Sequence, residues 1–303
     1  MSRIVFLLVP GLHLLDLAGP SQVFASAIDF GFDYRIEYVS EHATVSTAQG
    51  LTVNAEPSLP TLSSADLIVV PGWRAGSGLR DTGPLAAGTL AWLRGHHAAG
   101  GTVASVCAGA DALGRAGLLD GRRCTTHHEL QDELARRYPH ANVVRDVLYV
   151  VDGRVISSAG IASGIDLALH LMATRHGPEV AARIARTMVV YARRNGDETQ
   201  ASALLRHRGH VNDAVHRVQD LIENRLADRL PLADLADAVG CSERTVTRMF
   251  GRATGMTPLR YQQLLRVERA EHLIGQGATV ESAAHEVGFE DARMLRRLRQ
   301  RAS

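Results

Sequence analysis

The chain has 303 residues, of which 46% are hydrophobic and 21% charged, so it is long enough for two domains and has the composition of an ordinary globular protein. A formal net charge of +1 gives by itself no indication of a nucleic-acid partner. Three scattered cysteines, Cys107, Cys124 and Cys241, exclude a disulfide framework and a zinc cluster, so we expect no metal, no cofactor and a reducing cytoplasm.

The first apolar run, residues 4–9, is interrupted by Pro10, His13 and Asp16, and no small-residue cleavage site follows it. This pattern argues against a signal peptide. No stretch approaches the ~18 uninterrupted apolar residues of a membrane span, so we expect no membrane contact.

Short apolar segments alternate with helical patterns over the first two thirds of the chain. We predict buried parallel strands at residues 4–9, 67–70 and 102–106, and helices at residues 16–28 and 84–99. The alternation predicts an α/β fold over residues 1–192, with a layered, mostly parallel sheet flanked by helices. In such sheets ligands bind where strands end and helices begin.

The corner at residues 105–111 joins a predicted strand directly to a predicted helix, with Cys107 at the junction. The amides and dipole of a helix N-terminus lower the pKa of a thiol and favour the thiolate. A buried structural cysteine is the other interpretation, and position alone does not decide between the two.

Five segments of this region follow one another in an order typical of a known family. They are residues 9–24, residues 70–72, the Cys107 corner, residues 117–128 and residues 158–168. Together they resemble the ThiJ/PfpI superfamily, a branch of the class I glutamine-amidotransferase-like fold, across most of residues 3–190. The resemblance places Cys107 at the position of the nucleophile, Asp16 at that of a neighbouring carboxylate, and His127 near the pocket.

Two departures from the family weaken an enzymatic interpretation. Ala108 stands where the family's proteases carry a His, and Trp73 replaces the second Gly of the usual Pro-Gly-Gly oxyanion turn. Isonitrile hydratases of the same branch also combine an Asp with an elbow Cys, but a Thr commonly follows that Cys. An activated nucleophile needs a base within hydrogen-bond reach, and the sequence offers only His127 or His128.

We therefore assign no catalytic residue and expect a vestigial or ligand-sensing pocket. It is lined by Cys107, Asp16, His127 and Gly72. A nearby carboxylate raises the pKa of a thiol and a helix N-terminus lowers it, so we predict a cysteine that oxidises or alkylates readily but does not turn over the effector. The histidine pairs at residues 96–97 and 127–128 do not indicate a metal, because adjacent residues on a helix or strand point apart.

Residues 193–213 break the α/β rhythm and are predicted to be a linker. A helix around Val215, Val218, Leu221 and Ile222 follows, and we expect it to pack on the next motif. The second domain is predicted at residues 214–303.

Two helix-turn-helix patterns occupy the last quarter of the chain, at residues 232–250 and 280–298. In the first, Gly240 supplies the backbone freedom of a tight turn and Ser242 is placed to cap the second helix. Pro258 opens a connecting helix of roughly 18 residues, which at ~1.5 Å per residue spans about 27 Å. We call the second helix of each motif its reading helix. Adding the offsets of the two reading helices from the ends of the connecting helix brings their separation near the ~34 Å of one DNA turn.

The charge distribution agrees with a DNA-binding second domain. Residues 1–190 hold 15 Arg and 17 acids, a balance of −2, whereas residues 191–303 hold 18 Arg and 15 acids, a balance of +3. A basic helix face is by itself usually only solvated, but the duplicated pattern argues against that interpretation.

The segment from about His216 to Arg301 resembles the AraC/XylS DNA-binding domain. Carried over position by position, the family's base-contacting residues are Arg244, Thr247 and Arg248 in the first reading helix and Arg293, Arg296 and Arg297 in the second. Arg252, further along the first helix, is expected to contact phosphate. The family usually has an aromatic residue where Arg299 stands and a further stretch after the last helix.

A ThiJ/PfpI-like domain followed by an AraC-type domain is the architecture of GlxA-type transcriptional regulators. The resemblance implies a sequence-specific regulator that binds promoter or operator DNA, responds to a small-molecule effector and forms a homodimer through its first domain. AraC-type proteins often activate transcription, which would add RNA polymerase as a partner, but no residue here indicates such a contact. The alternative is a cysteine-dependent hydrolase or isonitrile-hydratase-like enzyme with an accessory DNA-binding domain.

Overall fold

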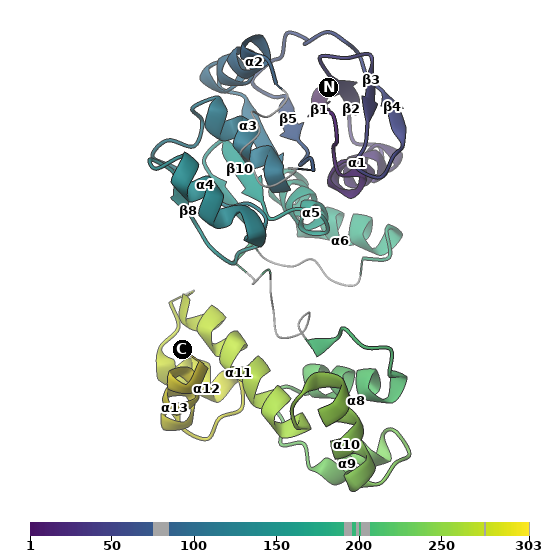
Figure 1. The fold of residues 1–303 in the computed structure, drawn as a ribbon, viewed down its shortest axis with the longest axis vertical. Coiled ribbons are helices and arrows are strands. Elements are labelled where there is room, and N and C mark those ends of the chain that lie inside the picture. Colours follow the sequence, from purple (N-terminus) through teal and green to yellow (C-terminus); the bar gives the residue numbers. More distant parts are fainter. Residues whose placement is uncertain (75–84, 191–195, 198–199, 201–206, 276, 303) are drawn as a thin grey trace. The chain divides into compact units, whose positions relative to one another are not determined.

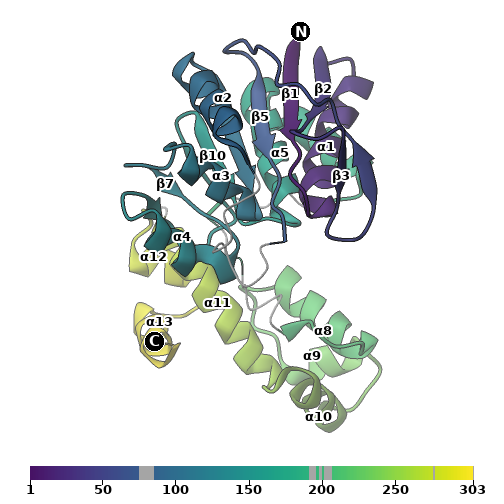
Figure 2. The ribbon, with the colours of Figure 1, turned by 45° about the horizontal axis from the view of Figure 1, so that its top comes forward.

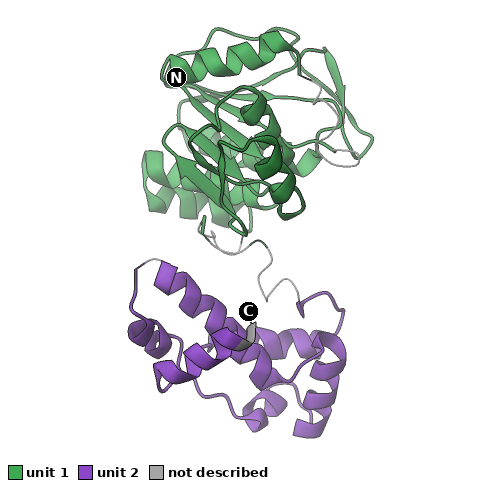
Figure 3. Cartoon of the chain, turned by 60° about the vertical axis from the view of Figure 1, so that its left-hand side comes forward, with its two compact units in different colours: residues 1–200 green, residues 201–303 purple. Residues whose placement is uncertain are grey.

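The computed structural model describes residues 1–303 except 75–84, 191–195, 198–199, 201–206, 276 and 303. The chain divides into two compact units, Met1–Gln200 and Ala201–Ser303 (Figure 3). None of the described helices is long and apolar enough to cross a membrane.

A six-stranded sheet forms the centre of the first unit (Figure 1). Its strands, in spatial order, are β2 (Tyr34–Val39), β1 (Ser2–Leu7), β5 (Leu67–Val70), β6 (Thr102–Val106), β10 (Val155–Ser158) and β9 (Tyr149–Asp152). All neighbours are parallel except β9, which pairs antiparallel with β10 at the edge. Two small two-stranded sheets join β3 (Thr44–Ser46) to β4 (Thr52–Asn54) and β7 (Arg123–Cys124) to β8 (Asn142–Val143). The predicted mostly parallel sheet is confirmed.

Helices cover both faces of this sheet (Figure 2). One group holds α1 (Leu14–Asp29), α5 (Ser163–His176) and α6 (Pro178–Thr187), which pack against one another. The other holds α2 (Ala87–Ala98) and α3 (Ala110–Arg115), which contact each other. The next helix in the sequence, α4 (Gln131–Arg137), contacts β8. The predicted helix at residues 84–99 begins at Ala87, and Pro84 lies outside the described residues. The central strands could be predicted from the sequence because β5 is fully buried and β1 and β6 are buried over most of their length, which favours apolar residues on both faces.

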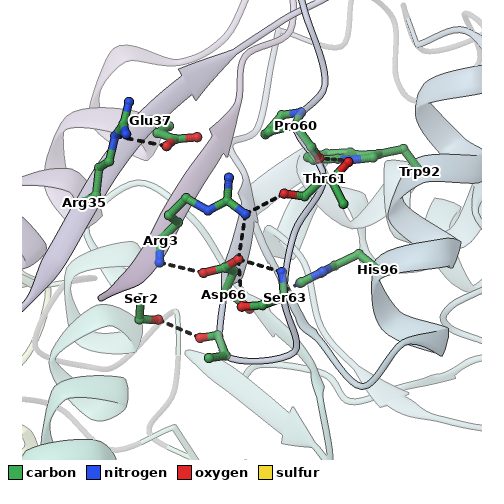
Figure 4. Close-up of polar contacts among 11 residues, drawn as sticks. Ser2, Arg3, Arg35, Glu37, Pro60, Thr61, Ser63, Asp66, Trp92 and His96 are labelled. Carbon is green, nitrogen blue, oxygen red and sulfur yellow. Dashed lines mark hydrogen bonds and ion pairs between the residues drawn. The ribbon is translucent and has the colours of Figure 1, made fainter.

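A buried carboxylate holds the start of the sheet together (Figure 4). Asp66 is 2% exposed and accepts hydrogen bonds from the Arg3 amide at 2.7 Å and from the Ser63 amide at 2.7 Å. The Arg3 guanidinium lies 3.0 Å from the same side chain. Burial alone would raise the pKa of Asp66, but the hydrogen bonds from Arg3 and Ser63 lower it on balance. This cluster joins the first residues of β1 to the turn before β5 and lies at the opposite ends of these strands from Cys107.

The second unit is helical and contains two apolar clusters. Its helices are α8 (Asp213–Asn224), α9 (Leu232–Asp237), α10 (Glu243–Thr254), α11 (Pro258–Gly275), α12 (Val280–Glu286) and α13 (Ala292–Ala302). The first cluster joins Val215, Val218 and Ile222 of α8 to Val246 and Phe250 of α10. The prediction that the helix around Val215 packs on the first helix-turn-helix motif is therefore confirmed.

The two motifs are built from the same local parts. Ser242 Oγ accepts a hydrogen bond from the Thr245 amide at 3.2 Å, and Thr279 Oγ1 accepts one from the Ser282 amide at 3.1 Å. Each cap satisfies an amide that the first turn of a helix leaves unpaired. Gly240 and Gly288 occupy the turns with φ of 64° and 84°, in the left-handed region that glycine enters without strain. The predicted cap at Ser242 and the predicted turn at Gly240 are confirmed.

Arg266 of α11 ties the second motif to the segment that precedes the first. Its guanidinium donates to the carbonyl oxygens of Leu226 at 2.8 Å, Asp228 at 2.8 Å and Gly288 at 2.7 Å. A Cβ on Gly288 would lie 2.0 Å from the Ala227 carbonyl oxygen, so the second turn packs directly on the segment before α9. These contacts fix how the two motifs sit within the second unit.

The predicted linker, residues 193–213, lies partly outside the described residues. Of its described parts, Arg208 forms ion pairs with Asp220 at 2.5 Å and Glu223 at 2.7 Å, both on α8. Gln219 also donates to the carbonyl oxygen of His207 at 2.9 Å. The end of the predicted linker is therefore docked on the second unit.

Candidate functional site

Four loops at the carboxyl edge of the sheet converge on Cys107. Cys107 follows β6, Gly72 follows β5, Gly160 follows β10, and Asp16 lies in the first turn of α1 after β1. Strand order reverses between β1 and β5, because β1 is followed by β2 on one side and β5 by β6 on the other. Ligands of open α/β sheets bind at such a switch point.

Cys107 sits on a tight elbow between two glycines. Its φ is 56°, a left-handed conformation that a residue other than glycine or asparagine seldom adopts. A Cβ on Gly72 would lie 2.6 Å from Cys107 Cβ, and one on Gly160 would lie 2.2 Å from the same atom. Only glycine fits at these two positions, so the elbow is enclosed by backbone.

Asp16 lies next to the thiol and is fully buried. Its Oδ1 accepts a hydrogen bond from the Ile161 amide at 2.7 Å. Its Oδ2 is also buried, and no described residue meets the distance and angle criteria for a hydrogen bond to it. A Cβ on Gly72 would lie 2.5 Å from this oxygen. Burial raises the pKa of Asp16, although the Ile161 amide and the charge of His13 oppose that shift.

Burial also raises the pKa of Cys107 well above its ordinary value, and the negative charge of Asp16 raises it further. The side chain is only 6% exposed. The Ala108 amide lowers the pKa, but by less. Cys107 opens a short 3-10 helix, Cys107–Gly109, that leads directly into α3. The prediction that this N-terminus favours a thiolate is wrong, because burial and the charge of Asp16 raise the pKa of the thiol. The predicted ready oxidation or alkylation of Cys107 stays a prediction, and the raised thiol pKa argues against it, because the thiolate is the reactive form.

His127 stands at the edge of this group and not in its centre. No hydrogen bond joins it to Cys107 or Asp16 in the part of the chain that the structure describes, and its Nδ1 lies 3.6 Å from Glu129. Burial lowers its pKa, as do the charges of His128 and His13. The rings of His127 and His128 are 4.3 Å apart, so the expectation that these neighbours point apart is wrong. His127 precedes the short helix at His128–Leu130 and has extended backbone.

Three residues of this site were not singled out in the sequence. Ile161 holds Asp16 through its amide and has a φ of 47°, a rare conformation for a β-branched residue. Thr126 donates to the Cys107 carbonyl oxygen at 2.8 Å, and Gly160 packs on the elbow. All three lie in segments that carried the family resemblance, but contact across loops cannot be read from those segments.

The first reading helix, α10, presents an exposed basic stripe. Arg244, Arg248 and Arg252 are exposed and follow one another at four-residue spacing, so they share one face. None of the three forms an ion pair with another described residue. Thr247 is half-buried, and its hydroxyl donates to the Glu243 carbonyl oxygen at 2.9 Å.

The second reading helix, α13, is also basic, but part of its charge is paired. Arg293, Arg296 and Arg297 are exposed. Arg296 lies 2.6 Å from Glu281 of α12, and Arg299 lies 2.5 Å from Glu271 of α11. The two reading helices therefore differ in how much free positive charge they present.

The comparisons with known proteins cover both units. Residues 2–174 match the DJ-1/PfpI family, and residues 235–302 match the helix-turn-helix domain. The HTH-type transcriptional regulator CdhR of Pseudomonas aeruginosa is 31% identical over 277 residues, which is 89% of this chain and 80% of CdhR. The isonitrile hydratase of Pseudomonas putida is 37% identical over 175 residues, 56% of this chain and 70% of the hydratase.

A solved structure supports the same assignment. An AraC family transcriptional regulator from Pseudomonas putida superposes with a TM-score of 0.53 and 26% identity, covering 62% of this chain and 100% of that one. The relatives that resemble the chain along most of its length are regulators, and the hydratase matches a shorter part of it. The chain therefore belongs to the DJ-1/PfpI family, among those HTH-type transcriptional regulators that join this domain to an AraC-type helix-turn-helix domain.

Proposed function

We propose that the chain regulates transcription by reading a specific DNA sequence with α10 and α13, under the control of a small molecule bound in the first unit. The observation that carries the proposal is the exposed stripe of Arg244, Arg248 and Arg252 on a capped second helix, where none of the three forms an ion pair with a described residue. Such a helix can enter the major groove, where Arg reads guanine with two hydrogen bonds.

The base-contacting set proposed for α10 is Arg244, Thr247 and Arg248, with Arg252 on phosphate. For α13 it is Arg293, Arg296 and Arg297. Exposure of all six arginines supports these assignments. Thr247 is the weaker member, because its hydroxyl is already bonded to the Glu243 carbonyl oxygen and only its methyl group is free for a contact.

The effector site is proposed at Cys107, Asp16, Gly72 and His127, at the carboxyl edge of the sheet. Asp16 supports this choice, because its buried carboxylate lies beside the Cys107 thiol and can accept a hydrogen bond from a ligand. Binding without turnover is expected, since the thiol pKa is raised and no histidine forms a hydrogen bond with the thiol among the described residues. The carboxylate beside the thiol, Asp16, raises that pKa further.

The first unit is further proposed to form a homodimer, as the family resemblance implies. A mass measurement in solution checks this, with twice the chain mass of 32.7 kDa as the expected value. RNA polymerase is a partner only if the protein activates transcription. No contact in the described part of the chain indicates activation.

A gel-shift series with the DNA flanking its own gene tests the function. The protein should retard one promoter fragment at moderate salt at a concentration at which random DNA of equal length stays free. Equal retardation of both fragments would contradict sequence-specific regulation.

The second candidate function is an isonitrile-hydratase-like or hydrolytic activity at Cys107. The 37% identity to the hydratase and the contact between Cys107 and Asp16 favour it. Steady turnover of an isonitrile, amide or ester by the wild type, abolished in Cys107→Ser, would establish this activity. Loss of effector-dependent DNA binding in Cys107→Ser, without turnover by the wild type, would support sensing instead.

A further inference from the structure

The first unit ends by folding back onto the wall of the Cys107 site. The carbonyl oxygen of Gly196 accepts hydrogen bonds from the Leu148 amide at 2.8 Å and the Tyr149 amide at 3.1 Å. The side-chain amide of Gln200 donates to the carbonyl oxygens of Thr126 at 3.0 Å and Val147 at 2.9 Å. We call these four hydrogen bonds the exit latch, because the second unit begins at the next residue.

Gly196 of the latch packs closely against Tyr149. A Cβ on Gly196 would lie 2.7 Å from both the carbonyl oxygen and the ring of Tyr149, so no larger residue fits there. The Tyr149 ring is itself held 5.1 Å from the ring of His170 on α5. The Leu148 carbonyl oxygen accepts from the Ala159 amide at 2.7 Å, one residue before Gly160, which packs on the Cys107 elbow.

Thr126 joins the latch directly to Cys107. It is fully buried, and its hydroxyl donates to the Cys107 carbonyl oxygen at 2.8 Å. Its own carbonyl oxygen accepts from Gln200 and, at 3.3 Å, from Gln131. One residue therefore contacts both the elbow and the end of the first unit, and its neighbour in sequence is His127.

The latch combines favourable and unfavourable contacts. The Gln200 amide nitrogen has two carbonyl acceptors, but its Oε1 is buried without a hydrogen-bond partner among the described residues. A buried unsatisfied acceptor costs about as much free energy as two neutral hydrogen bonds contribute. A small shift of Thr126 can thus change the fraction of molecules in which Gln200 is docked.

We infer that the exit latch transmits the state of the Cys107 site to the DNA-binding unit. A ligand that displaces the elbow or the Thr126–His127 segment moves the Thr126 carbonyl. This movement breaks the hydrogen bonds of Gln200 and Gly196, so that the connection between the units becomes longer. The change in reach alters how the second unit is presented to DNA. This inference rests on the proposed function for its effector and its DNA.

Amide hydrogen exchange at Leu148 and Tyr149 measures the latch in the full chain without effector or DNA. Gln200→Ala should raise the exchange rate of both amides at least about threefold, because the segment that carries the Gly196 carbonyl loses two hydrogen bonds. Gln22→Ala, the same truncation at an exposed position of α1, should leave both rates unchanged. Unchanged rates in Gln200→Ala would overturn the latch.

Thr126→Val tests the link to Cys107. The substitution keeps the Thr126 carbonyl but removes the hydroxyl that bonds Cys107, so it should also raise exchange at Leu148 and Tyr149. In the double variant with Gln200→Ala, the increase should be smaller than the product of the two single effects. Exchange at Val69 and Ala104, in the central strands, reports any general loss of stability. Independent effects of the two substitutions would overturn the link.

The last arm measures DNA affinity. Gln200→Ala should change the Kd for a duplex selected by the wild type by about threefold or more, whereas Gln22→Ala should not. A faster amide exchange with an unchanged Kd would overturn the proposed transmission. If the wild type selects no duplex at all, the proposed function fails, while the exchange measurements still decide whether the latch exists.

Discussion

At the residue scale, the arginines of α10 are expected to have different roles although all three are exposed. Arg248→Ala should weaken specific binding by about 1 to 3 kcal/mol and relax discrimination at one base pair, because it removes contacts to a base edge. Arg252→Ala should lower the affinity for all sequences alike and reduce the salt dependence. Binding to a panel of operators with single mismatches measures both effects. Identical profiles for the two variants would show that the roles are assigned wrongly.

The charge of Asp16 is expected to protect Cys107 from alkylation. Asp16→Asn keeps an oxygen that accepts from the Ile161 amide but removes the negative charge that helps raise the thiol pKa. Because the thiolate fraction increases, iodoacetamide should modify Cys107 about three- to tenfold faster at pH 8, as followed by mass spectrometry of its peptide. Asp29→Asn, at the exposed end of α1, is the matched control. A rate equal to or below that of the wild type would contradict this account of the site.

The position of Cys107 could be predicted from the sequence, but its protonation could not. A strand that runs into a helix locates the elbow, and the family motifs add Asp16 and Gly72. The thiol pKa depends on burial and on a carboxylate 91 positions away in the chain, and sequence spacing gives the strength of neither. The helix N-terminus was the only influence on the thiol pKa that the local sequence indicated.

At the element scale, α13 is expected to contribute less to affinity than α10. Arg296 must leave Glu281 before it can contact DNA, whereas Arg248 has no ion-pair partner among the described residues. Arg296→Ala should therefore weaken DNA binding by less than Arg248→Ala, the difference being about 0.2 to 1 kcal/mol for an exposed pair. Glu281→Gln should strengthen binding slightly and Glu290→Gln, at another exposed position, should strengthen it less. Fluorescence anisotropy with one selected duplex gives all of these affinities.

Arg266 is expected to fix the spacing of the two motifs. Arg266→Met keeps most of the side-chain volume but removes the donors to Leu226, Asp228 and Gly288, so the free energy of unfolding should fall by about 2 kcal/mol or more. Arg269→Met, an exposed position on the same helix, should change it by less than about 0.5 kcal/mol. Denaturant unfolding followed by helical circular dichroism provides the comparison. Equal losses in the two variants would remove the structural role given to Arg266.

The elements that could be predicted from the sequence are those whose formation depends on residues close together in the chain. The apolar strands β1, β5 and β6, the cap at Ser242 and the turn at Gly240 each depend on a few neighbouring residues. The edge strands β2 (Tyr34–Val39) and β9 (Tyr149–Asp152) were not predicted, because neither forms the continuous apolar run that marked the central strands, although the alternation in β2 is also a strand signal. The pairing of Arg296 with Glu281 and the contacts of Arg266 join residues of different helices, which periodicity does not describe.

At the scale of the whole molecule, the near-zero net charge conceals a division between the two parts of the chain. Residues 1–190 carry a balance of −2 and residues 191–303 one of +3, and the second part holds both basic reading helices. Binding to DNA should therefore depend on salt through the second unit, while the first unit adds no general attraction to phosphate. Specificity must come from base contacts, since a net charge of +1 gives little non-specific affinity.

The most direct test is an anisotropy titration with two duplexes at several salt concentrations. One carries a sequence selected by the wild-type protein from random DNA, and the other has the same composition in scrambled order. We expect the selected duplex to bind at least about 10³-fold more tightly than the scrambled one. Both affinities should fall as the salt concentration rises, while the selected duplex stays strongly preferred. Equal Kd values for the two duplexes at every salt concentration would contradict a sequence-specific regulator.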